Sequence, residues 1–273
     1  MKYKTECVTN AGNGKWNEDR LFIKDNLIGV IDGATPIHNF SYNGYSTIAE
    51  WMVDSFTKNI TTIPQDAYID YKLICREIID KLGNESYIKE LASYDKPCFT
   101  SATVSFARQT LLCQVIGDSY VYVQKKNGDI ICHTDSRVDF YAAKTVNSVI
   151  HAKIEKGDIP STIEKQKIEN RSWMNVKGGY WVVGFEGNFE NEFIEVTYGR
   201  EEVSNIFICT DGFARLMNEF ELIEIADLIN RKISLNEAIK LLRYYEERNS
   251  DKENFPCVKK SDDATAVMIS FDI

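Results

Sequence analysis

The sequence predicts an α+β fold in which antiparallel β-sheets are flanked by helices. Segments rich in Val, Ile, Phe, Tyr and Thr, which are typical of strands, gather towards both ends of the chain. Paired amphipathic segments interrupt them, without the regular strand-helix-strand alternation of a parallel sheet. No Pro/Gly/Ser-rich linker divides the 273 residues. We therefore expect one domain that spans residues 1–273.

The expected strands show the periodicity and punctuation of β-structure. In "TSATVSFA", residues 100–107, apolar residues alternate with Ser and Thr, the period of a strand with two different faces. The pair Asn127-Gly128 follows one expected strand and precedes the next, and suits a tight hairpin. The expected strands are 2–9, 20–32, 100–107, 111–124, 129–134, 178–184, 192–198, 204–210 and 264–272.

Helices are expected where apolar residues recur at helical spacing. This pattern runs from Tyr45 to Ile60 and again over residues 71–82, and both segments need a sheet to pack on. A third helix is expected to begin at Ser234, where Glu237 completes a capping box. The segment 135–175 is polar and mixed, and we expect a helical flap there.

Composition excludes several classes of protein. A formal charge of −9 and a pI near 5.0 disfavour nucleic-acid partners, which clustered Lys and Arg would hold. No apolar run reaches the roughly 18 residues that span a bilayer, and no signal peptide begins the chain. The seven cysteines form no CxxC pair, so neither a disulfide framework nor a zinc site is expected. We expect a soluble protein of a reducing cytoplasm.

Acidic residues mark the ends of several expected strands. Asp32, Asp118 and Asp211 each follow an apolar run, and Asp263 precedes the last one. A single Asp-Gly pair after a strand is ordinary turn chemistry. If the strands are neighbours, however, these carboxylates converge at one edge, where they repel one another unless a cation neutralises them. Oxygen ligands favour Mg²⁺ or Mn²⁺, and only three histidines are present, which disfavours zinc.

The order of these acids resembles that of the metal-dependent Ser/Thr protein phosphatases, the type 2C family, and the chain looks like a divergent, bacterial member. The resemblance runs from about Asn17 to Met268. It implies a four-layer α-β-β-α sandwich with two Mn²⁺ or Mg²⁺ ions at one edge. The matching motifs are Asn17-Glu18-Asp19, Asp32-Gly33, Gly117-Asp118-Ser119, Thr210-Asp211-Gly212 and Asp262-Asp263.

The resemblance implies a role for each matching residue. Asp32 would bridge the two metals and Gly33 would offer its carbonyl oxygen. Asp211 and Asp263 would bind the first metal. The acidic pair of Glu18 and Asp19 would act mostly through water, and Asp118 matches the residue associated with a third, weaker metal.

The chain departs from the family pattern at three places. The arginine that often grips the substrate phosphate is replaced by Gly14, with Lys15 beside it. We expect Lys15 or Arg215 to contribute the positive charge instead. His38 follows Asp32-Gly33 without the usual glycine pair and is a candidate general acid. Ala264 occupies the position after Asp263, where asparagine is usual.

The sequence leaves two functions open. The first is a phosphomonoesterase that hydrolyses phosphoserine, phosphothreonine or a similar phosphomonoester with a metal-activated water. The alternative is a catalytically weakened regulatory module that keeps the metal site and binds a partner. The missing arginine favours the second function, and the retained aspartates favour the first. Oligomeric state has no signature in the sequence.

Overall fold

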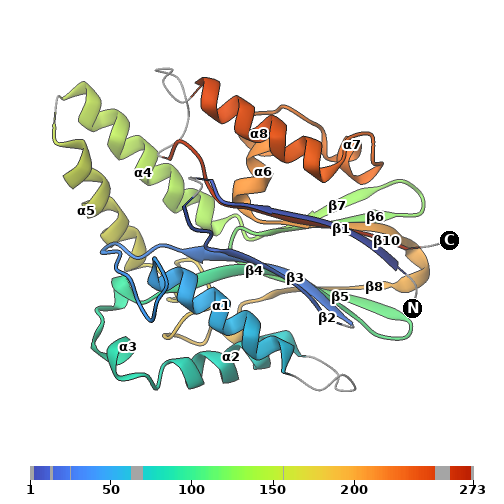
Figure 1. Cartoon of the computed structure of the whole chain (residues 1–273), viewed down its shortest axis with the longest axis horizontal. Helices are drawn as coiled ribbons and strands as arrows, with labels where there is room; N and C mark the ends of the chain where they lie inside the picture. The colour runs from blue at the N-terminus through green and yellow to red at the C-terminus, as the bar shows by residue number, and fades with distance from the viewer. Residues whose placement is uncertain are drawn as a thin grey trace.

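The protein is a sandwich of two antiparallel sheets with helices on both outer faces, as the computed structural model shows (Figure 1). It describes residues 3–12, 15–24, 26–62, 70–155, 157–249 and 259–271. Helices cover both outer faces of the sandwich and form its two outer layers. A further pair of helices projects from one end. The predicted four-layer α+β architecture is therefore confirmed.

Each sheet has five strands. In the first sheet the order is β1-β10-β9-β6-β7, and in the second it is β2-β3-β4-β5-β8. The first comprises β1 (Tyr3–Asn10), β10 (Ala264–Phe271), β9 (Val203–Cys209), β6 (Tyr120–Lys125) and β7 (Ile130–His133). The second comprises β2 (Asp19–Lys24), β3 (Leu27–Ala34), β4 (Cys98–Phe106), β5 (Thr110–Ile116) and β8 (Ile194–Gly199). All neighbouring strands pair antiparallel.

The helices form three groups. On the second sheet lie α1 (Ile48–Thr61) and α2 (Tyr71–Leu82), followed by the short α3 (Ser86–Glu90). On the first sheet lie α6 (Asp211–Asn218), α7 (Ile225–Ile229) and α8 (Leu235–Asn249). The antiparallel pair α4 (Arg137–Ile154) and α5 (Ile159–Arg171) projects from one end of the sandwich, away from the chain termini (Figure 1). Short 3-10 turns occur at Ser93–Asp95, Phe189–Asn191 and Arg200–Glu202.

Apolar layers hold the sandwich together. Strand β3 lies between two of these layers, which explains its continuous apolar sequence. Ile28 and Val30 pack between the two sheets, whereas Leu27 and Ile31 pack against α1 and α2. Because successive side chains point to opposite faces of a strand, a strand buried on both sides reads as a continuous apolar run. A third apolar layer, which includes Phe207, joins the first sheet to α6 and α8.

Three of the predicted strands differ from the structure. The segment 20–32 is a hairpin of two strands, β2 and β3. The segment 111–124 is also two strands, and these belong to different sheets because the chain turns at Gly117, whose φ of 76° suits glycine. Within 178–184 the structure has only isolated bridges, such as Phe99 to Val183.

Two local predictions are confirmed. Gly128 lies in the tight turn between β6 and β7, where its N–H donates to the Lys125 carbonyl oxygen. At the start of α8, the Ser234 N–H donates to Glu237 Oε2 over 2.9 Å, and the Glu237 N–H donates to Ser234 Oγ over 3.2 Å. This reciprocal pair is the predicted capping box.

Replacing Ser234 by Ala should lower the free energy of unfolding by about 1 kcal/mol, because the hydroxyl cap of α8 is lost. Urea denaturation followed by circular dichroism measures the change. Ser234→Asn, which keeps a capping acceptor, should stay close to wild type. An Ala variant as stable as the Asn variant would contradict the role of the cap.

Six of the seven cysteines lie within the described residues. Cys7, Cys75, Cys98, Cys113, Cys132 and Cys209 are free thiols, and Cys257 lies outside the described residues. In the same ranges, none of the helices combines the length and apolar character that crossing a bilayer demands.

Candidate functional site

The first part of the site is built by the β2-β3 hairpin. Antiparallel pairing places Asp19, the first residue of β2, opposite Asp32, near the end of β3. Asp32 also lies opposite Thr100 of β4. The N–H of Gly33 donates to the Glu18 carbonyl oxygen over 3.1 Å, which holds the two strand ends together. Three acidic residues therefore meet at one edge of the second sheet.

The other sheet brings its acids to the same edge. Asp118 precedes β6, Asp211 begins α6 directly after β9, and β6 pairs with β9. A cavity of about 230 Å³ at this edge is lined by Asp32, Asp118, Asp211 and Asp262. These four carboxylates come from distant parts of the sequence and from both sheets, and each is half-buried. The expected convergence of strand-end acids is thus present for Asp32, Asp118 and Asp211.

Burial and mutual repulsion perturb these carboxylates. Burial raises the pKa of Asp32 well above its ordinary value, and the charges of Asp211 and Asp19 raise it further. Burial also raises the pKa of Asp118, with a contribution from Asp211. Burial is the main reason why the pKa of Asp211 is raised, although a hydrogen bond with Asp32 opposes this shift. Crowding of this kind is relieved by a bound cation.

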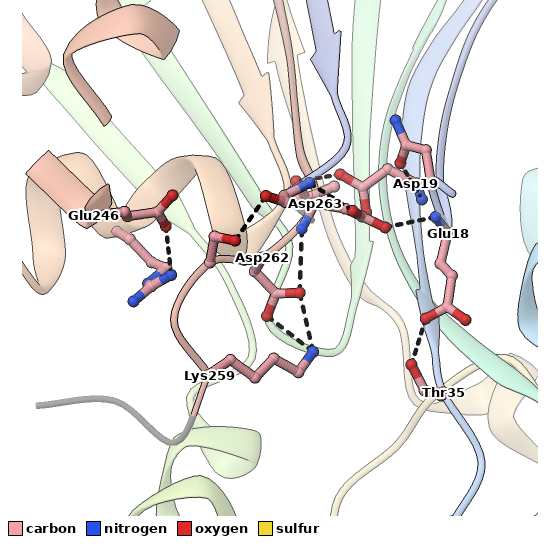
Figure 2. Close-up of polar contacts among 12 residues, drawn as sticks. Glu18, Asp19, Thr35, Glu246, Lys259, Asp262 and Asp263 are labelled. Carbon is pink, nitrogen blue, oxygen red and sulfur yellow. Dashed lines mark hydrogen bonds and ion pairs between the residues drawn. The ribbon is translucent and has the colours of Figure 1, made fainter. Parts of the chain in front are cut away.

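One predicted ligand, Asp263, does not line the 230 Å³ cavity. Asp263 turns towards the N-terminal segment, where its Oδ1 accepts from the Gly12 N–H over 2.9 Å and its Oδ2 accepts from the Glu18 N–H (Figure 2). Its neighbour Asp262 lines the cavity instead. The Asp263 carboxylate therefore binds backbone N–H groups and does not face the cavity. Adjacent residues before a strand point to opposite sides, so only one of the two aspartates faces it.

Close packing fixes the position of Asp262 beside Asp211. A Cβ atom on Gly212 would lie 1.9 Å from the carbonyl oxygen of Asp263, so only glycine lets the start of α6 approach this backbone. Thr210 adds a second link, since its N–H donates to the Thr265 carbonyl oxygen over 3.0 Å.

Behind the four aspartates lie two buried acids. Glu18 is 7% exposed and Asp19 is 1% exposed. Thr35 donates a short hydrogen bond to Glu18 Oε2, and Thr210 Oγ1 donates to Asp19 Oδ2 over 2.9 Å. Glu18 Oε1 and Asp19 Oδ1 are buried without a hydrogen-bond partner in the part of the chain that the structure describes. Buried oxygens without partners are costly, and a hydrated cation would satisfy them.

Cations border the same cavity. Lys259 Nζ lies 2.9 and 3.0 Å from the two carboxylate oxygens of Asp262 (Figure 2). Arg171, at the end of α5, donates to the carbonyl oxygens of Ala34 and Thr35, over 3.3 and 2.9 Å. It thereby ties the α4-α5 pair to the chain that follows Asp32.

No group of three or more His, Cys, Asp or Glu side chains is assembled as a ready metal-binding cluster within the described ranges. The acids instead line the cavity together with Lys259. Asp32 and Asp211 share a hydrogen bond, and Asp262 pairs with Lys259.

The residues expected to contact a phosphate or a leaving group have other partners. Arg215 Nε lies 2.7 Å from Glu219 and its Nη1 lies 2.6 Å from Glu246, so its guanidinium is held by two glutamates. It borders a wider cavity of about 790 Å³ that Asp118 and Asp211 also line, but its charge is already paired. The role of Arg215 in gripping a phosphate stays a prediction, and the structure shows its guanidinium paired with Glu219 and Glu246.

Neither His38 nor Lys15 lines the 230 Å³ cavity. His38 Nδ1 lies 2.8 Å from Asp95, and this hydrogen bond raises the pKa of His38. Its side chain is 58% exposed and lines neither the 230 Å³ nor the 790 Å³ cavity. Lys15 is exposed. Gly14, where the phosphate-gripping arginine was expected, lies outside the described residues.

Asp262, Lys167 and Lys259 are among the cavity residues that were missed from the sequence. The Asp262-Asp263 doublet was a signal, but sequence spacing does not say which member faces the cavity. Lys167 of α5 lines the wider cavity, and Lys259 lines both cavities. Lysines in polar segments carry no sequence pattern that marks them as site residues.

Comparison with known proteins decides the family. A family model described as protein phosphatase 2C matches residues 9–251. The chain belongs to the protein phosphatase 2C family. Membership of this family supports a serine/threonine phosphatase activity. A search of curated proteins found no match.

Solved structures of protein phosphatase 2C type share the fold. The serine/threonine phosphatase Stp1 from Staphylococcus aureus is 15% identical, with a TM-score of 0.60 over 100% of this chain and 96% of that one. PppA of Pseudomonas aeruginosa, a regulatory component of a type VI secretion system, is 12% identical with a TM-score of 0.60 over 99% of both chains.

A third structure contains metal. It is the catalytic domain of the phosphatase PstP in complex with two manganese ions, which is 13% identical with a TM-score of 0.53 over 98% of this chain and 97% of that one. At these sequence identities the comparison shows a shared fold. The function of this chain has to be inferred from the residues of its own site.

Proposed function

We propose that this protein phosphatase 2C member hydrolyses phosphoserine and phosphothreonine, or a similar phosphomonoester, with divalent metal ions as cofactors. The observation that carries the proposal is the meeting of Asp32, Asp118, Asp211 and Asp262 in one cavity. They lie on four separate segments and on both sheets. Carboxylates that raise one another's pKa in this way are maintained at a cost to stability, which a functional role explains.

The donor set fits Mn²⁺ or Mg²⁺. All four side chains offer hard carboxylate oxygens, and the buried Glu18 and Asp19 each keep one oxygen without a partner. Asp32, Asp211 and Asp262 would hold the metals, with the Gly33 carbonyl oxygen as a further ligand and Asp118 at a weaker third position. Metal ions bound here supply an activated water and neutralise charge on the phosphoryl oxygens.

The chain's own groups would bind and orient the substrate. The 790 Å³ cavity beside the aspartates has room for a phosphorylated side chain. Lys167 and Lys259 bring positive charge to its wall. Protein phosphatase activity on a phosphopeptide and activity on a small phosphomonoester are both compatible with a cavity of this width. A lysine attracts a phosphate as a point charge, without the bidentate geometry of arginine.

The protein should hydrolyse a phosphothreonine peptide and p-nitrophenyl phosphate in the presence of Mn²⁺, and lose that activity after chelation with EDTA. Phosphate release measures both reactions, and re-addition of Mn²⁺ should restore them. Activity that is unchanged by EDTA would overturn the metal-dependent mechanism. Binding of Mn²⁺ with no hydrolysis of either substrate would instead favour the regulatory module.

Mn²⁺ should also stabilise the folded protein. Saturation at a hundred times the dissociation constant contributes about 2.7 kcal/mol, which raises the Tm of a protein of this size by roughly 5 °C or more. Differential scanning calorimetry with and without Mn²⁺ measures the shift, and K⁺ at equal ionic strength is the control. A Tm that responds equally to both salts would argue against a specific site.

A further inference from the structure

Lys259 places an ammonium group among the carboxylates that are proposed to bind metal. Its Nζ contacts both carboxylate oxygens of Asp262, at 2.9 and 3.0 Å. It also lines the cavity that Asp32, Asp118 and Asp211 share. Figure 2 shows the lysine side chain reaching towards Asp262 from the segment that leads into β10.

Several nearby carboxylates attract the Lys259 ammonium. Attraction to Asp262 is the main reason why the pKa of Lys259 is raised, and Asp211 and Asp32 add to the effect. The same ammonium opposes the upward pKa shift of Asp211 and of Asp263. In electrostatic terms it neutralises part of the carboxylate charge, which is the task expected of a metal ion.

The pair is nevertheless accessible. The Lys259 side chain keeps 56% of its surface exposed, and the Asp262 side chain keeps 30%. An ion pair as exposed as this one contributes little to folding, so it can open without unfolding the protein. A lysine on a flexible stem can withdraw into solvent when another cation arrives.

We propose that Lys259 is an internal counter-cation that occupies Asp262 in the metal-free protein and competes with the divalent ion for it. The inference rests on the proposed metal site and extends it, since it assigns to Lys259 the control of metal affinity. Both oxygens of Asp262 accept from the ammonium, whose positive charge also repels a divalent ion at the same carboxylate, so the lysine competes with the metal for this ligand. The affinity for metal is therefore weaker than the carboxylates alone would provide.

The adjacent lysine offers a matched control. Lys260 is exposed and carries the same charge one residue further along the chain, but it does not line either cavity. Replacement of either lysine removes one positive charge from the same segment. Only the loss of Lys259 removes the group that occupies Asp262.

Isothermal titration calorimetry of the metal-free protein with MnCl₂ tests the competition. Lys259→Met should bind Mn²⁺ about tenfold more tightly than wild type, which corresponds to ~1.4 kcal/mol. Lys260→Met should change the affinity little, and Lys259→Arg, which keeps the charge, should stay closer to wild type than Lys259→Met. If Lys259→Met binds no more tightly than Lys260→Met, the competition is refuted while the metal site stands. If neither wild type nor any variant binds Mn²⁺, the proposed metal site itself fails.

Chemical labelling of the wild-type protein gives a second readout. While its Nζ is hydrogen-bonded to both carboxylate oxygens of Asp262, Lys259 is less available to an acylating reagent than a lysine in solvent. Acetic anhydride at pH 8, followed by peptide mass spectrometry, should therefore label Lys259 more in the presence of Mn²⁺ than in its absence, with Lys260 unchanged. Labelling of Lys259 that is the same or lower with Mn²⁺ would contradict displacement of the lysine.

Discussion

Replacing Asp32 by Asn should lower Mn²⁺-dependent phosphatase activity by on the order of a thousandfold, a loss of about 4 kcal/mol of transition-state stabilisation. Asp32 links the acidic residues of the two sheets. It forms a hydrogen bond with Asp211 and lies opposite Asp19 in the β2-β3 hairpin. An amide keeps the shape of the side chain but supplies only one neutral oxygen. The change should appear in kcat/KM for the phosphothreonine peptide.

The same substitution should stabilise the metal-free protein. Burial, Asp211 and Asp19 raise the pKa of Asp32 above its ordinary value of 3.8. The protonated Asp32 carboxyl therefore contributes its full stability below pH 3.8, the ordinary pKa of the unfolded chain. This contribution is lost as the pH rises through the higher pKa of Asp32 in the folded protein. Asn cannot ionise, so the metal-free variant should have a higher Tm than wild type at pH 7 and a similar one at acidic pH.

A surface substitution controls for the loss of charge alone. Asp80→Asn changes an aspartate whose side chain is 65% exposed on α2, and it should leave activity and metal-free Tm close to wild type. An Asp32→Asn enzyme with wild-type kcat/KM, or one whose metal-free Tm falls, would refute the account of crowded metal-binding carboxylates.

Replacing Glu246 by Ala should lower the free energy of unfolding by roughly 3 kcal/mol, because the buried guanidinium of Arg215 then keeps only one of its two carboxylate partners. The Glu246 side chain is 2% exposed and that of Arg215 is 10% exposed. Glu246 accepts from Arg215 over 2.6 Å and from Arg243 over 2.7 Å. This network joins α6, which carries Asp211, to α8. Chemical denaturation of wild type and variant measures the loss.

The double variant separates charge from packing. Arg215→Met combined with Glu246→Leu removes both charges and should recover much of the stability, since a buried pair is often replaceable by apolar residues. Glu247→Ala, at an exposed position of α8, should have little effect. A Glu246→Ala variant as stable as Glu247→Ala would show that the buried network does not stabilise the helix layer.

The Arg215 network also shows where sequence reasoning stops. A lone arginine four residues after Asp211 is a reasonable candidate for a phosphate clamp, but one of its two glutamate partners, Glu246, comes from the end of α8, 31 residues away. The choice between Asp262 and Asp263 has the same origin. Two adjacent acids are equivalent in sequence, and only the packing of Gly212 and the Glu18 backbone decides which one faces the cavity.

The sequence by itself determined the α+β class, the capping box of α8, the hairpin at Asn127-Gly128 and the set of strand-end acids. These features depend on local periodicity and turn chemistry, which neighbouring residues specify. Only the tertiary structure decided that β5 and β6 belong to different sheets, that Asp262 rather than Asp263 lines the cavity, and that Lys259 lies among the carboxylates. Those outcomes depend on contacts between residues far apart in the chain, whose geometry is set by the packing of the two sheets and not by any local pattern.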